Sequence, residues 1–451
     1  YTLVDNLPQG PAKTWYPDGT IRSIDHFRNG QLHGEIKRYL ENGNYFSVNE
    51  FVDGKMQGRN RWYFPDGTLK SDSIYENNVR HGLAKFYYED GTFKEEAMYA
   101  AGVPNGPSKY YHPNGQLAET RTFKNGKFDG MHTYYREDGT LHSKQTKVNG
   151  KKNGLCEYFY SDGQLEMAGT YVDGLSEGKL TWYYQGGDVK TMAYKKGGKL
   201  EGEYRSYWME GSLSSVEHYV DDKLQGTRVE YFDFTDKVRA RKHYDKGELN
   251  GPYQLYNLNG DLLIDAVVDY GRGTSVKAVH INEDVIASSL DDWDRIGTFG
   301  SIVQVLFHGR RFAELEMLAN YIYTHPEYRP RLYPRIYSYM GASFWTINVK
   351  THKEYFLDTI DAWEQAYPDS VTPKLLRAKI QIKVAWGFRG SDYSRSVSAA
   401  SAARFKKALQ EADNMIEKLV AEYPENPHIY TEWLSVLLGL GGKKSEMRAV
   451  F

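Results

Sequence analysis

Over the first 260 positions, Tyr, Phe, Thr and Val gather in stretches of seven to nine residues, separated by short polar segments rich in Gly, Asp and Asn. Stretches such as Lys85-Phe86-Tyr87-Tyr88 and Thr120-Arg121-Thr122-Phe123 fit strands and lack helical periodicity. The glycines that end them recur every 24 residues, at Gly19, Gly43, Gly67, Gly91, Gly115, Gly139, Gly163, Gly187 and Gly211. This fixed interval predicts a repeat protein whose repeats mainly touch their neighbours.

Each repeat contains two turn signals of different composition. In Tyr16-Pro17-Asp18-Gly19-Thr20, Pro sets the first corner, Asp can bond the backbone ahead and Gly accepts a positive φ. About half a period later comes a second signal, as in Asn125-Gly126-Lys127-Phe128-Asp129-Gly130. The two signals predict opposite rims of one antiparallel sheet, with two strands per repeat.

About eleven copies of the repeat can be counted, the last from Gly251 to Gly260. They predict an elongated, single-layer β-ribbon. Most of the repeat tyrosines are expected to pack neighbouring rings along one face of the sheet, an architectural role. Tyr183, Tyr207 and Tyr231 are our candidates within the ribbon for contact with a partner.

From about Leu290 the apolar spacing becomes helical, so the chain is predicted to be an α+β protein of two domains. We assign residues 1–275 to the β-repeat domain, 276–290 to a linker and 291–451 to an all-α domain. The expected helices cover residues 292–307, 312–323, 332–345, 353–366, 374–386, 399–422 and 428–438.

The repeats resemble the MORN-repeat family, and more closely its bacterial variant. The resemblance lies in Tyr134-Tyr135-Arg136-Glu137-Asp138-Gly139, Tyr158-Phe159-Tyr160-Ser161-Asp162-Gly163 and the Asn-Gly-Lys-x-x-Gly turns, over Gly10 to Gly260. Two copies depart from the pattern, at Gly186-Gly187 and at Asp233 to Lys237, and distortion or a kink is expected there. Because bacterial members are often classed as antitoxin-like or immunity-like, the resemblance implies protein binding.

The helical part resembles a degenerate tetratricopeptide-like stack, with Pro at helix ends as in Ala366-Tyr367-Pro368. The segment from Trp386 to Tyr393 is similar to an Arg-Gly-Ser-x-Tyr signature of a bacterial helical domain of unknown function. Trp386, Arg389 and Tyr393 are therefore candidates for a recognition pocket. The alternative is that the Arg-Gly break only caps a helix end.

Composition narrows the function further. The net charge of -2 gives no general reason to expect nucleic acid, and no run of about 18 apolar residues predicts a membrane span. Metalloprotease, phosphate-loop and nucleophile-elbow motifs are absent from the sequence, so no catalytic, metal or cofactor residue is assigned. Cys156 replaces Ala84 and Ser108 of other repeats and is expected to be a small packed side chain. His26, His33, His81 and His132 are expected to face solvent.

The sequence thus favours a non-catalytic protein-binding module, foremost an immunity or antitoxin-type protein that occludes a cognate toxin. The alternative is an envelope-associated scaffold that binds lipid or glycan through the ribbon. The chain opens at Tyr1 and not at Met, which suggests a removed upstream segment, a secretion signal being one option. The compartment, periplasmic or cytoplasmic, and the oligomeric state stay open.

Overall fold

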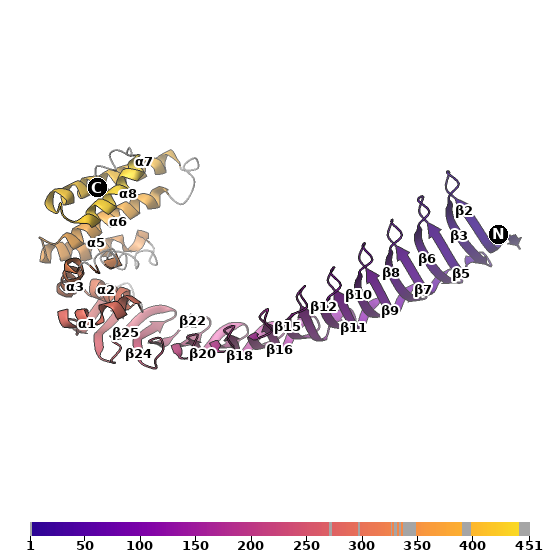
Figure 1. The fold of residues 1–451 in the computed structure, drawn as a ribbon, viewed down its shortest axis with the longest axis horizontal. Coiled ribbons are helices and arrows are strands. Elements are labelled where there is room, and N and C mark those ends of the chain that lie inside the picture. The colour runs from indigo at the N-terminus through magenta and orange to yellow at the C-terminus, as the bar shows by residue number, and fades with distance from the viewer. Residues whose placement is uncertain are drawn as a thin grey trace. The chain divides into compact units, whose positions relative to one another are not determined.

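The computed structural model describes residues 2–269, 273–295, 298–325, 327–328, 332, 335–336, 349–389 and 398–441. These residues form an antiparallel sheet of 27 strands followed by seven helices, which confirms the predicted α+β architecture (Figure 1). The chain divides into two compact units. Unit 1 comprises Tyr1–Ser212 and His218–Lys223, and unit 2 comprises Leu213–Glu217 and Leu224–Phe451.

Strands follow one another at the interval that the glycines predict. They are β1 (Thr2–Val4), β2 (Leu7–Trp15), β3 (Ile21–Arg28), β4 (Gln31–Leu32), β5 (Gly34–Tyr39), β6 (Tyr45–Val52), β7 (Lys55–Tyr63), β8 (Leu69–Glu76), β9 (Val79–Tyr87), β10 (Phe93–Ala100), β11 (Val103–Tyr111), β12 (Leu117–Lys124), β13 (Lys127–Phe128), β14 (Gly130–Tyr135), β15 (Leu141–Val148), β16 (Lys151–Phe159), β17 (Leu165–Val172), β18 (Leu175–Tyr183), β19 (Val189–Lys196), β20 (Lys199–Tyr207), β21 (Leu213–Val220), β22 (Lys223–Leu224), β23 (Gly226–Tyr231), β24 (Val238–Asp245), β25 (Glu248–Tyr256), β26 (Leu262–Asp269) and β27 (Gly273–Val279). Within each unit, neighbours in sequence pair antiparallel, as Ala12 with Asp25 and Tyr253 with Ala266.

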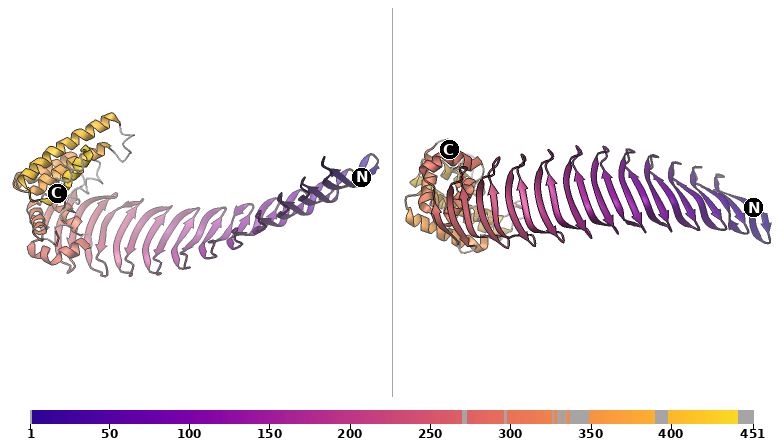
Figure 2. Two further views of the ribbon diagram at one scale, coloured as in Figure 1. Left: turned by 45° about the horizontal axis from the view of Figure 1, so that its top comes forward. Right: turned by 90° about the horizontal axis from the view of Figure 1, so that it is seen from below.

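The two turn signals form two different hairpin loops, along the two edges of the sheet (Figure 2). In the first loop, Asp18 Oδ1 accepts the Thr20 amide at 2.9 Å, and the Gly19 amide donates to Tyr16 O at 3.0 Å with a Gly19 φ of 88°. In the second loop, Asn29 and Gly30 have φ of 49° and 78°, the positive pair that a two-residue type I′ turn requires. Both predicted turns are therefore confirmed.

The two departures from the repeat pattern behave differently. At Gly186-Gly187 the turn is undistorted, because the Gly187 amide donates to Tyr184 O at 2.9 Å as in the other repeats. The loop from Asp233 to Lys237 is one residue longer, since the Phe232 amide reaches Lys237 O at 3.1 Å. It places Phe234 at a φ of 58° with 74% of its surface exposed. Only this second copy is distorted.

Side chains join successive repeats along one rim. The hydroxyls of Tyr16, Tyr88, Tyr160 and Tyr184 each donate to the carbonyl 23 residues ahead, at 2.7–2.8 Å. We expect Tyr160→Phe and Tyr184→Phe each to lower the free energy of unfolding by about 1 kcal/mol, because each removes one part-buried hydrogen bond. Denaturant titration tests this, with Tyr194→Phe, whose side chain is exposed, as control. Equal stabilities of all three variants would contradict the joining role.

The helices are α1 (Glu283–Arg295), α2 (Thr298–His308), α3 (Phe312–Thr324), α5 (Val349–Ala366), α6 (Val371–Arg389), α7 (Ala399–Glu422) and α8 (Pro427–Leu440). The helix expected over residues 292–307 is instead two helices, so that prediction was wrong. The first begins earlier because the Asn282 side chain accepts the Val285 amide at 2.9 Å and caps it. Most of the predicted 332–345 helix lies outside the described residues.

Unit 2 has one apolar core that combines sheet and helices. Leu255, Ile264 and Ala266 on the last strands are buried in the same cluster as Ile302 and Leu306 of α2. Further along, Trp363 of α5 is fully buried and stacks on Phe312 of α3 at 5.5 Å between ring centroids. The helices α6, α7 and α8 lie side by side (Figure 1).

Candidate interaction surface

One face of the sheet in unit 1 buries small side chains along its middle. Strand by strand, one residue per strand forms this central row, and the pairs Ala84–Ala97 and Leu180–Ala193 lie directly opposite one another. Most of its members are almost fully buried, among them Ala84, Ala97, Ser108, His132, Cys156, Leu180 and Ala193. We call this face the packed face. Cys156 is buried as predicted, and burial raises the pKa of its thiol, which disfavours a reactive thiolate.

Larger side chains lean over the central row and hide it from water. The Arg80 guanidinium lies 5.3 Å from the ring centroid of Phe86 and 4.9 Å from that of Tyr99. At Gly169 a Cβ would come 2.6 Å from Leu180 Cγ, so this glycine leaves the space that the leucine fills. The packed face therefore serves as the core of a single-layer sheet.

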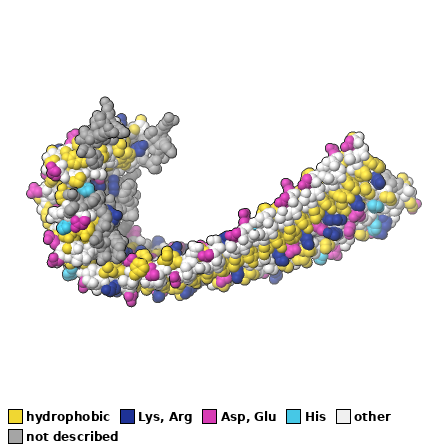
Figure 3. All heavy atoms as spheres, viewed as in Figure 1, with side chains coloured by type: hydrophobic (Ala, Val, Ile, Leu, Met, Phe, Trp, Pro, Cys, Tyr) yellow, Lys and Arg dark blue, Asp and Glu magenta, His cyan; other side chains and the backbone are white. Residues whose placement is uncertain are grey.

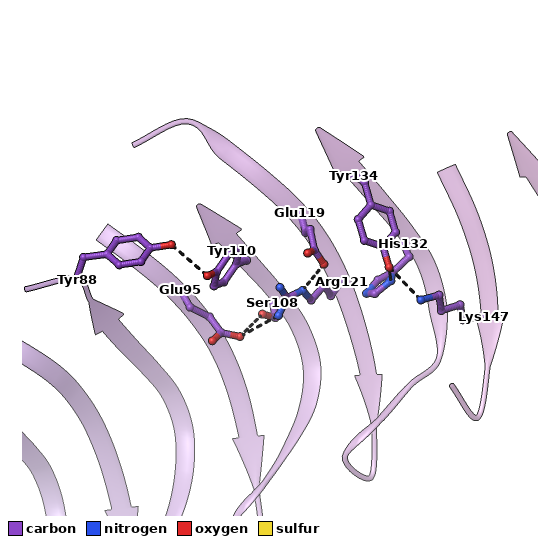
Figure 4. A network of polar contacts seen from close by, with 9 residues as sticks. All are labelled: Tyr88, Glu95, Ser108, Tyr110, Glu119, Arg121, His132, Tyr134 and Lys147. Carbon is purple, nitrogen blue, oxygen red and sulfur yellow. Dashed lines mark hydrogen bonds and ion pairs between the residues drawn. The ribbon is translucent and has the colours of Figure 1, made fainter. Parts of the chain in front are cut away.

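A polar network crosses the packed face from β10 to β15 (Figure 4). Arg121 donates to Glu119 at 2.7 Å and lies 3.5 Å from a Glu95 oxygen that also accepts from Ser108 at 3.2 Å. The guanidinium of Arg121 lies 4.7 Å from the Tyr110 ring centroid. Each charge has an opposite charge or a ring beside it, so this network is structural.

His132 corrects the expectation that the histidines near turns face solvent. It occupies the central row, is 1% exposed and packs 4.3 Å from the Phe128 ring. Its Nδ1 lies 2.9 Å from the Tyr134 hydroxyl, which also accepts from Lys147 at 3.0 Å (Figure 4). Burial, with Lys147 and Arg121 nearby, lowers the pKa of His132 to about 4. The ring is therefore neutral at pH 7.

The other face of the sheet, which we call the open face, carries an aromatic ladder along one rim. Ring centroids of Tyr39 and Tyr45 lie 4.9 Å apart, and those of Tyr45 and Tyr63 lie 5.6 Å apart. Phe93 joins Tyr111 in the same way, at 5.0 Å. Because the rings are tilted against one another, they fill the space between repeats and confirm the architectural role of these tyrosines. Figure 3 shows hydrophobic side chains in a band along the sheet.

Toward the opposite rim, the open face carries a line of side chains across eight successive strands, β8 to β12 and β14 to β16, of which six are apolar and two are half-buried threonines. Each is the chain neighbour of a packed-face residue, as Leu83 is of Ala84, and so points the other way. We call this line the apolar strip: Ile74, Leu83, Met98, Pro107, Thr122, Met131, Thr146 and Leu155. The exposed fractions of Ile74, Leu83, Met98, Met131 and Leu155 lie between 37% and 53%.

Glycines at the end of the second turn signal, such as Gly106 and Gly130, lie beside the strip. A Cβ on Gly106 or Gly130 would come 3.1 Å from the Cβ of Met98 or Thr122, and both glycines have positive φ. A groove of about 280 Å³ opens at the Ile74 end, between Leu83 and the Arg59–Asp72 ion pair. Exposed apolar side chains gathered on several neighbouring strands make this surface a candidate interaction site.

The predicted partner-contacting tyrosines lie at the ends of β18, β20 and β23. All three are half-buried, and the carbonyls of Tyr183 and Tyr207 accept the hydroxyls of Tyr160 and Tyr184. Their role in partner binding stays a prediction. In α6 the guanidinium of Arg389 lies 5.3 Å from the Trp386 ring centroid, which brings these two candidates together, whereas Tyr393 lies outside the described residues.

A second hollow, of about 450 Å³, lies in unit 2 where α3 ends and α6 and α8 begin. Glu316, Asp369, Glu422 and Glu425 contribute carboxylates to its wall. Trp363 Nε1 donates to Glu316 at 2.7 Å, while burial raises the pKa of that carboxyl. Lys374 bonds Glu422 and the Tyr423 hydroxyl. Sequence reasoning missed both this hollow and the apolar strip.

Across the described parts of the chain, no group of three or more His, Cys, Asp or Glu residues is placed to hold a metal ion. None of the described helices is long and apolar enough to span a bilayer.

Five segments match the MORN repeat variant family model. They are residues 8–29, 56–77, 80–101, 104–125 and 152–173. The MORN repeat variant is thus present within the β-repeat region, at the positions that the glycine interval marks. No curated protein matches the chain.

Among solved structures, a mutant form of the Tc holotoxin pore of Photorhabdus luminescens is similar at 12% identity and a TM-score of 0.14. The alignment covers 59% of this chain and 18% of that one, so the chain spans less than a fifth of its length. With so low a TM-score, this likeness says nothing about function.

Proposed function

We propose that this chain is a non-catalytic protein-binding module of the immunity or antitoxin type, which neutralises a cognate toxin by covering its active surface. The proposal rests on the apolar strip, because exposed apolar side chains on neighbouring strands of a sheet can be buried against a protein partner. The MORN repeat variant supports a binding role in general, and repeat arrays usually present long surfaces to large partners.

Steric occlusion requires a rigid platform, and two features of the sheet in unit 1 support this part of the proposal. The central row fills the packed face, and the rim tyrosines join successive repeats. Tyr183, Tyr207 and Tyr231, with Trp386, Arg389 and Tyr393, remain the further residues proposed to contact the toxin. The helical unit is proposed to be tetratricopeptide-like and to contribute to the same grip.

The proposal predicts one partner at stoichiometric yield when the intact chain is used as bait in extracts of its native host. That partner should be a toxin encoded beside this chain, and its toxicity should reappear when this chain is deleted. Recovery of no partner, together with normal growth after deletion next to an intact toxin gene, would overturn the proposal. Saturable attachment to vesicles or glycans without any protein partner would favour the scaffold alternative.

A further inference from the structure

We infer that the apolar strip is the docking site for an amphipathic α-helix of a protein partner, laid across the strands. This inference rests on the proposed protein-binding function and specifies the surface and the kind of partner.

The spacing of the strip selects a helix. Its eight residues come from eight neighbouring strands, so its seven steps of about 4.8 Å span roughly 34 Å. Apolar residues three or four apart on a helix repeat about every 5.4 Å, close to one contact per strand, and about 23 helical residues cover the strip. An extended segment repeats on one side about every 6.7 Å, out of step with the strands, and finds no free backbone partners on a sheet face.

Charges beside the strip argue for a protein partner and against a membrane. On the open face, two residues from the strip along six of its eight strands, lies a charged row of three acids and three bases: Asp72, Lys85, Glu96, Lys109, Lys144 and Glu157. Acid and base lie opposite one another at Asp72–Lys85, Glu96–Lys109 and Lys144–Glu157. An anionic bilayer would require an excess of positive charge, whereas a helix flanked by residues of both signs complements this row.

The same row argues against a second copy of the chain. A two-fold axis parallel to the strands lays the strip on itself with β8 over β16 and β9 over β15. Asp72 then faces Glu157, and Lys85 faces Lys144, and like charges opposed across an interface are unfavourable. A two-fold axis along the strip places the two charged rows on opposite sides, so that the rows do not pair at all, and in neither arrangement do the charges of one copy complement those of the other.

The test is a selection of random 24-residue peptides, displayed on phage, against the intact chain. Enriched peptides are expected to carry apolar residues at three- and four-residue spacing and to become helical on binding. Leu83→Lys and Leu155→Lys should each weaken binding of such a peptide about tenfold or more, since each places a charge in the contact. Val172→Lys, at an equally exposed hairpin end, should not.

The same set of experiments also tests the other possible occupants of the strip, which are an extended peptide, a second copy of the chain and a membrane. Peptides with period-two alternation, or peptides whose binding both strip variants leave unchanged, would overturn the helix proposal. The same holds for strip-dependent self-association in sedimentation equilibrium, or for strip-dependent binding to phosphatidylserine vesicles. Thermal unfolding confirms that the variants are folded. If peptides bind elsewhere, for instance with loss only on Trp386→Ala, the strip proposal fails while protein binding stands. If no peptide and no host partner binds, both fail.

Discussion

Replacement of Glu230 by alanine is expected to lower the free energy of unfolding of unit 2 by about 3–5 kcal/mol. Glu230 lies in β23 and is 5% exposed. Lys242 Nζ, Arg239 Nη2 and Arg228 Nε lie 3.0, 2.9 and 3.2 Å from its oxygens. Burial alone would raise the pKa of this carboxyl, but the three cations outweigh burial and lower it. Alanine would remove the carboxylate that the three cations share. Lys242, 14% exposed, would lose its ion pair with Glu230, whereas Arg228 would still lie 3.2 Å from Glu217.

Denaturant unfolding of wild type and variant, followed by the helical signal, measures this cost. Glu96→Gln removes a carboxylate from a more exposed pair, 3.4 Å from Lys109, and should change stability by about 0.5 kcal/mol or less. Adding Lys242→Met to Glu230→Ala should recover part of the lost free energy of unfolding, because it removes a mostly buried cation that has lost its ion pair with Glu230. A loss under about 1 kcal/mol for Glu230→Ala would show that the cluster does not depend on this carboxylate.

Local features of the fold could be predicted from the sequence. The Asp-Gly and Asn-Gly turns depend on a few adjacent residues, and they form at the expected positions. At Gly186-Gly187 the expected distortion was wrong, because the turn there has the same hydrogen bond as in the other repeats. Cys156 could be placed because its repeat position holds Ala84 and Ser108 in other copies. The same comparison places His132 in the central row, because Ser108 and Cys156 occupy its repeat position in the neighbouring copies. For α1, the start of the helix depends on the Asn282 cap and not on the apolar spacing from which the helix was predicted.

The surface could not be predicted in the same way, because it depends on how repeats differ and not on what they share. At the repeat position of Leu83, other copies carry Glu35, Arg59, Pro107 and Met131. A consensus sequence of the repeat does not keep these differences. Only the pairing of the strands shows that the apolar residues at this position form one line with Ile74 of β8 and Met98 of β10. The Glu230 cluster is similar, since Arg239 and Lys242 of β24 meet Glu230 only through the pairing of β24 with β23. Aligning the copies by position singles out Leu83, Met131 and Leu155 as apolar departures, but it does not place them beside Ile74 and Met98.

Mild acid is expected to destabilise both units, through one buried histidine in each. His308 of α2 lies against Tyr355 and Phe356, with ring centroids 5.9 and 5.6 Å away, and burial lowers its pKa to about 4, as for His132. An unfolded histidine has a pKa near 6.5. Between these two pKa values the histidine binds a proton in the unfolded chain but not in the folded chain. The free energy of unfolding therefore falls as the pH drops from about 6.5 to 4.

Each histidine can remove up to about 3 kcal/mol over that window, with a slope approaching 1.4 kcal/mol per pH unit. The measurement is denaturant unfolding between pH 7 and 5, where carboxylates contribute least. His132→Ser, the residue of the neighbouring repeat, should flatten the pH dependence of unit 1, and His308→Gln that of unit 2. His81→Gln, which removes an exposed ring, is the control for the loss of a histidine side chain. Equal slopes for wild type and His132→Ser would mean that His132 takes up a proton in the folded sheet, and hence that the packed face admits water at its centre.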